Sequence, residues 1–185
     1  MDAFLDLPSE QRAIRCEQVG DELGMPPGAV EKDYWVCWVL RALYRLSVGP
    51  HLAFKGGTSL SKCYGMIDRF SEDIDLVIER TFLGFDGDDA PENAPSGKER
   101  VRRIDRLKVA CREYIAATLF PELCAIVQQR FGEAHARSLI LDPDDPDQQS
   151  ILFPYVSALE APAYVRPVVK IELGASFTFP TSILL

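Results

Sequence analysis

Residues 71–79 alternate polar and apolar side chains, a pattern that predicts a strand with two different faces. Ile74, Leu76 and Ile78 would lie on a core face, and Asp73, Asp75 and Val77 on the other. The two carboxylates then share a face, about 7 Å apart along the strand. Such like charges are unfavourable on a largely apolar strand unless a cation compensates them, and hard oxygen ligands suit Mg²⁺ or Mn²⁺. We expect Asp73 and Asp75 to bind metal; taken alone, the pair is equally compatible with an ordinary solvated face.

A glycine pair, Gly56 and Gly57, separates a predicted strand at 51–55 from a predicted helix at 58–66. Bare backbone can approach an anion there, and the helix that starts at Thr58 offers unpaired N–H groups to a phosphate. The spacing is not that of a P-loop. In isolation the pair is more typical of a tight turn, but a metal-bound triphosphate needs both a backbone cradle and carboxylates.

A second alternating stretch, residues 165–174, carries Lys170 and Glu172 on one face of a predicted strand. Glu172 would supply the third carboxylate of a two-metal site, and Lys170 would counter the charge that develops on phosphate. Each residue alone is more typical of a protein surface.

Composition indicates one globular domain over residues 1–185, with a helical N-terminal part at 1–47 and a flexible insertion at 86–98 that is rich in Gly, Asp and Pro. The longest apolar run has six residues, against about 20 for a bilayer span, and no signal-peptide pattern is present. We therefore expect a cytoplasmic protein without a membrane partner. Residues 9–23 and 29–46 are predicted helices.

A long helix is predicted at 99–131, broken near Pro121, with a core stripe at three- and four-residue spacing: Val101, Ile104, Leu107, Cys111, Tyr114 and Thr118. Residues 98–112 hold seven cations against two acids, although the whole chain has a net charge of −8. An acidic protein needs such a local cluster to bind RNA. A solvated helix face is the alternative for the Lys98–Arg112 stretch.

The acidic run at 142–147 predicts a solvated turn between two short strands, 139–141 and 151–153. An EF-hand that starts at Asp142 would need glycine at Asp147 and glutamate at Phe153, so a calcium loop is excluded.

Residues 54–62 and 69–76, read FKGGTSLSK and RFSEDIDL, resemble the signature of the AbiEii/AbiGii nucleotidyltransferase toxins, a branch of the polymerase-β-like superfamily. Residues 31–35 and 168–175 resemble the N-terminal helix and a later acidic strand of that family. The resemblance implies an α+β fold with a small mixed sheet flanked by helices. It also implies metal-dependent transfer of a nucleoside monophosphate from an NTP to an acceptor hydroxyl, with the tRNA 3′ end as one such acceptor, and a cognate antitoxin.

Residue by residue, the resemblance implies that Gly56, Gly57 and Thr58 hold the nucleotide triphosphate, and that Asp73, Asp75 and Glu172 bind the metals. Lys170 would lie by the phosphates. Arg69 and Ser71 belong to the same motif; they would orient the carboxylates or contact the nucleotide, and packing between helix and strand is an equal alternative.

Members of this family usually continue past the later acidic strand into a helical region, whereas this sequence ends ten residues beyond Ala175. Two alternatives stay open, of which only the first follows from this shortened end. One is a shortened, non-catalytic protein that binds nucleotide or a partner. The other is a transferase whose acceptor is a protein side chain.

Overall fold

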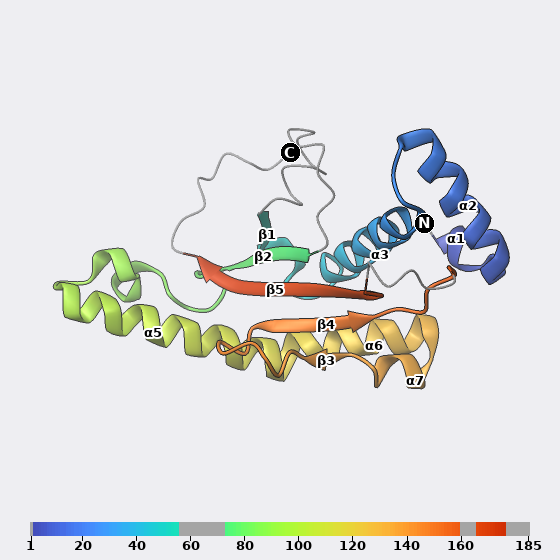
Figure 1. The fold of residues 1–185 in the computed structure, drawn as a ribbon. Coiled ribbons are helices and arrows are strands. Elements are labelled where there is room, and N and C mark those ends of the chain that lie inside the picture. The colour runs from blue at the N-terminus through green and yellow to red at the C-terminus, as the bar shows by residue number, and fades with distance from the viewer. Residues whose placement is uncertain (1, 56–72, 160–165, 177–185) are drawn as a thin grey trace.

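The computed structural model describes residues 2–55, 73–159 and 166–176. Over these residues the chain is a mixed α/β fold in which helices pack on a mixed sheet (Figure 1). The small mixed sheet flanked by helices that the sequence predicts is therefore confirmed.

The N-terminal part is helical, with α1 at Asp2–Leu5, α2 at Ser9–Leu23 and α3 at Pro27–Leu43. Helix α2 ends at Gly24, which adopts the left-handed conformation (φ 65°) that favours glycine. A Cβ atom on Gly20 would lie 2.6 Å from the carbonyl oxygen of Met25, so only glycine lets the chain turn this tightly into α3. Helix α3 ends three residues earlier than predicted.

Helix α3 is held in the core by aromatic packing and by a buried carboxylate. Trp35 is 2% exposed and stacks on Tyr155 with 5.2 Å between ring centroids. Glu31 is 1% exposed and accepts hydrogen bonds from the Ala158 N–H (2.7 Å) and the Ser157 hydroxyl (2.5 Å). The carboxylate of Glu31 thus fixes the chain that follows β4 against α3.

Five strands form one sheet in the described part of the chain, in the order β1-β2-β5-β4-β3. They are β1 at Leu52–Lys55, β2 at Asp73–Glu79, β3 at Ile140–Leu141, β4 at Ser150–Pro154 and β5 at Val168–Ser176. Strand β5 is central: it pairs parallel with β2 and antiparallel with β4. Pro167 precedes β5, as expected for a residue that cannot donate to the ladder.

The predicted alternation of faces is confirmed in β2 and β5. Ile74, Ile78 and Ile171 are fully buried in one core with the helices, on the face opposite the charged residues. Helices α3 and α5 contact this face of the sheet.

The long helix is interrupted earlier than predicted. Helix α5 covers Gly97–Tyr114, a π-helical segment η4 covers Ile115–Leu119, and α6 covers Phe120–Phe131, followed by the short α7 at Glu133–Ala136. Pro121 lies in the first turn of α6. Because proline lacks an N–H group and its ring crowds the carbonyl of the preceding turn, the chain widens in that turn rather than breaking at the proline.

The predicted core stripe is wrong at Val101, which is 57% exposed. The first turns of α5 extend past the ends of the strands in Figure 1, and the exposed Val101 belongs to these turns. Burial begins at Leu107 and continues every fourth residue through the π segment: Leu107, Cys111, Ile115, Leu119, Leu123 and Val127.

The segment before α5 contains two short 3₁₀ helices, Gly87–Asp89 and Pro91–Asn93. Arg103 donates to the carbonyl oxygens of Ala90 (2.9 Å) and Asp88, and Arg106 pairs with Asp89 at 3.1 Å. The mobility of residues 86–98 stays a prediction. Among the helices that the structure describes, none is long and apolar enough to cross a membrane.

Candidate active site

One row of polar residues crosses the sheet on the face opposite the core. Lys55 of β1 lies beside Asp75 of β2, Asp75 beside Glu172 of β5, and Glu172 beside Ser150 of β4. The row is continued by Asp142, which directly follows β3 and whose N–H donates to the Ser150 carbonyl at 2.9 Å. Residues as far apart in sequence as 55 and 172 thereby meet on one surface.

A second row lies one step along the strands. Asp73 of β2 is the register partner of Lys170 of β5, and Lys170 is that of Leu152 of β4. The structure thus brings four predicted site residues onto neighbouring strands and onto the same face: Asp73, Asp75, Lys170 and Glu172. Their strands are adjacent in Figure 1.

Asp75 and Glu172 form a close pair of like charges. The pKa of Asp75 is raised above 3.8, first by partial burial and then by the charge of Glu172 and a hydrogen bond with it; Asp73 adds to the increase and Lys55 opposes it. Two carboxyl groups can share a hydrogen bond only when one is protonated, and a cation bound between the ionised pair would relieve their repulsion. The pair therefore has the donor chemistry that Mg²⁺ or Mn²⁺ requires.

A complete metal cage is not formed. Within residues 2–55, 73–159 and 166–176, no three His, Cys, Asp or Glu side chains are arranged closely enough to hold a metal ion. The metal-binding triad of Asp73, Asp75 and Glu172 therefore stays a prediction, which the shared face and the Asp75–Glu172 contact support.

Lys170 lies between two carboxylates. Its Nζ is 3.0 Å from Glu172 Oε1 and 3.5 Å from Asp142 Oδ2. These neighbours raise the pKa of Lys170, Glu172 foremost, so the side chain remains an ammonium group. An ammonium here can meet the negative charge of a bound phosphate.

Asp142 is the residue of this face that sequence reasoning missed. It was predicted to lie in a solvated turn, but it is 9% exposed and paired with Lys170. The only local signal is the alternation along residues 139–142, which places Asp142 on the same face as Ile140 and opposite the buried Leu139. The pairing of β3 with β4, which brings Asp142 to the site, is not visible in the local sequence.

The predicted triphosphate cradle cannot be placed beside these groups. Gly56, Gly57, Thr58, Arg69 and Ser71 all lie outside the described residues, and their roles stay predictions. The described strands lead toward this segment from both sides: β1 ends at Lys55 and β2 begins at Asp73, the two residues that flank it.

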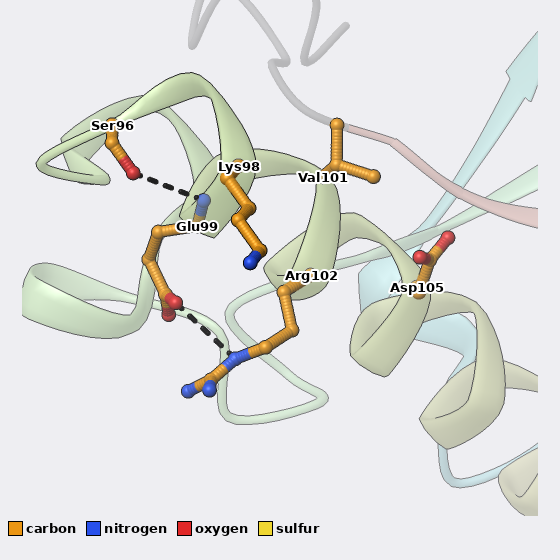
Figure 2. Close-up of a pocket in the computed structure, with 6 residues that line it drawn as sticks. All are labelled: Ser96, Lys98, Glu99, Val101, Arg102 and Asp105. Atoms are coloured by element: carbon orange, nitrogen blue, oxygen red, sulfur yellow. Dashed lines mark hydrogen bonds and ion pairs between the residues drawn. The ribbon is translucent and has the colours of Figure 1, made fainter.

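Three of the seven cations of the basic helix, Arg102, Arg103 and Arg106, are engaged with neighbouring residues of the chain. A hollow of about 320 Å³ lies at the start of α5. Among its lining residues (Figure 2), Ser96 accepts a hydrogen bond from the Glu99 N–H (3.2 Å), and Glu99 pairs with Arg102 at 3.2 Å. Arg103 and Arg106 hold the preceding segment, as described above. An RNA contact through α5 therefore rests on its other cations: Lys98, Arg100, Lys108 and Arg112.

Comparison with known proteins assigns the chain to a family. Residues 38–183 match the family model described as nucleotidyl transferase AbiEii toxin, type IV TA system. Neither the curated proteins nor the solved structures that were compared give a match. The matched region begins within α3, ends at residue 183 and includes the whole charged face. The chain therefore belongs to the AbiEii family of nucleotidyltransferase toxins of type IV toxin–antitoxin systems.

Proposed function

We propose that this chain is a divalent-metal-dependent toxin that transfers a nucleoside monophosphate from an NTP to an acceptor hydroxyl, with the tRNA 3′ end as the acceptor. The observation that carries the proposal is the close Asp75–Glu172 pair, on a face that also holds Asp73 and Lys170. Family membership supports the reaction class. A cognate antitoxin is the partner that a type IV system implies.

In this proposal Asp73, Asp75 and Glu172 hold Mg²⁺ or Mn²⁺. A divalent cation held by these carboxylates would supply Lewis-acid activation of the acceptor hydroxyl and neutralise charge on the leaving pyrophosphate. Lys170 orients and neutralises the phosphates from the neighbouring register position. Gly56, Gly57 and Thr58 bind the triphosphate, while Arg69 and Ser71 support the nucleotide or the carboxylates, as the family resemblance implies.

The proposal is tested by incubating the purified chain with each α-labelled NTP, Mg²⁺ and total tRNA. Asp75→Asn removes one carboxylate charge from the site. Glu79→Gln is the matched control, because Glu79 lies at the far end of the same strand and pairs with His51 at 3.0 Å. We expect label on RNA with the wild type and with Glu79→Gln, and loss of label with Asp75→Asn.

The outcomes separate the alternatives. Label on protein instead of RNA would assign a protein acceptor. Absence of label from a folded wild type, together with calorimetric binding of Mg²⁺·NTP, would favour a non-catalytic binding protein. Transfer by Asp75→Asn at the wild-type rate would refute the metal role of this carboxylate.

A further inference from the structure

Asp142 is fixed in place by hydrogen bonds within its own turn and with β4. Its N–H donates to Ser150 on β4 (2.9 Å), and its Oδ1 accepts from the Asp144 N–H (3.1 Å), which closes a short turn. Its second oxygen, Oδ2, remains directed to Lys170 at 3.5 Å. Since the residue is 9% exposed, its carboxylate has little freedom to turn elsewhere.

Lys170 is thus shared by two carboxylates of different character. Glu172, whose side chain is 46% exposed, also faces Asp75 and is a predicted metal ligand. When Glu172 binds a cation, its hold on the ammonium group weakens, because the carboxylate charge is then neutralised. Asp142 lies two strands further from Asp75 than Glu172 does and keeps its own contact with Lys170.

We infer that Asp142 is a positioning residue. It holds the Lys170 ammonium beside the Asp75–Glu172 pair when Glu172 binds the proposed divalent cation. The inference rests on the proposed function. Without the Asp142 charge, Lys170 would follow Glu172 or turn into solvent, and the phosphates would lose a fixed positive charge. The acidic turn therefore has a part in the site as well as in the fold.

Asp142→Asn separates the role of Asp142 in the site from its role in the fold. Asparagine retains an oxygen that can accept from the Asp144 N–H, so the turn is preserved while the charge that faces Lys170 is lost. Asp144→Asn is the matched control, since it removes the same charge from an exposed position of the same loop. We expect Asp142→Asn to lower kcat for transfer by about 10-fold, with KM for NTP changed less than about twofold. Asp144→Asn should leave both constants unchanged.

A double-mutant cycle with Lys170→Met tests whether Asp142 acts through Lys170. The double variant should be no slower than Lys170→Met alone, because Asp142 then has no ammonium to hold. If the losses in kcat of the two single variants multiplied in the double variant, the inference would be overturned. Full activity of Asp142→Asn would overturn it as well. Asp142→Glu, which restores the charge, should recover part of the kcat that asparagine loses.

If the wild type transfers no nucleotide, the proposed function fails. The inference is then tested by urea unfolding of the four proteins of the cycle: the wild type, Asp142→Asn, Lys170→Met and the double variant. Coupling between positions 142 and 170 in the free energy of unfolding would uphold the held ammonium. Additive effects of the two substitutions would refute it.

Discussion

Replacing Asp75 by asparagine should stabilise the protein while removing the proposed activity. Asp75 is the register partner of Glu172 on the adjacent parallel strand, and its pKa is raised, mostly by partial burial and by Glu172. The folded state therefore opposes ionisation of Asp75. Asparagine has nearly the same shape and removes the opposing charge.

The size of the gain follows from the strand spacing. Two unit charges about 5 Å apart repel by about 0.8 kcal/mol in water and by about 3 kcal/mol at an effective dielectric constant of 20. Asp75 is half-buried and Lys170 lies 3.0 Å from Glu172, so solvent and the ammonium screen most of this repulsion. We expect the free energy of unfolding to rise by about 1 kcal/mol at pH 7.

The gain should depend on pH. The pKa of Asp75 in the folded chain lies above the ordinary 3.8 of the unfolded chain. Below pH 3.8 the group is protonated in both states and carries no penalty; the penalty grows as the pH rises through the raised pKa and is complete above it. The difference between wild type and Asp75→Asn should therefore shrink in acid.

Urea unfolding followed by tryptophan fluorescence measures the effect, with and without Mg²⁺. A cation that binds the folded site raises the free energy of unfolding by mass action, so the wild type should gain more from Mg²⁺ than Asp75→Asn. Glu79→Gln is the control of opposite sign, because a hydrogen bond from His51 lowers the pKa of Glu79 and its loss should cost about 0.5 kcal/mol. If Asp75→Asn were less stable than the wild type at pH 7, the argument from repulsion would be refuted.

Three further predictions concern residues outside the charged face. Glu31→Ala should lower the free energy of unfolding by about 2–4 kcal/mol in urea, since two hydrogen bonds to a buried carboxylate are lost, whereas Glu31→Gln keeps an acceptor and should lose less. Arg103→Ala should speed hydrogen exchange at residues 88–90, because Arg103 binds the carbonyls of Asp88 and Ala90, while Arg102→Ala, at a side chain 70% exposed, should not. Burial lowers the pKa of His135 despite a hydrogen bond with the Pro154 backbone, so the unfolded chain takes up a proton first and stability should fall as the pH drops below 6.5; His135→Phe should weaken that dependence in urea titrations at several pH values.

The sequence predicted the faces of the central strands because that information is local. Alternation with a period of two places Asp73 with Asp75, and Lys170 with Glu172, whatever the strands pair with. The opposition of Asp75 and Glu172 is a different kind of fact. It depends on a parallel pairing between segments nearly a hundred residues apart, and no local pattern specifies that register.

The errors in the helices have the same origin. Val101 fits the apolar periodicity of α5, but periodicity does not say where the sheet beneath the helix ends. The seven cations of residues 98–112 read as one basic surface, yet Arg103 and Arg106 are bound by the segment that precedes the helix. Charge counts identify a candidate surface, and only the packing tells which of its charges are already used.

The net charge of the polar face supports a metal site more directly than any single residue does. Among the described residues around the Asp75–Glu172 pair, four carboxylates (Asp73, Asp75, Asp142 and Glu172) face two ammonium groups (Lys55 and Lys170), which leaves two negative charges when all are ionised. Lys55 comes from β1, beside Asp75, and Lys170 from β5, beside Asp73, so both lysines reduce the repulsion among the carboxylates. Their placement on one face favours a divalent cation as the compensating charge, and the stability lost to repulsion without it is the quantity that Asp75→Asn should recover.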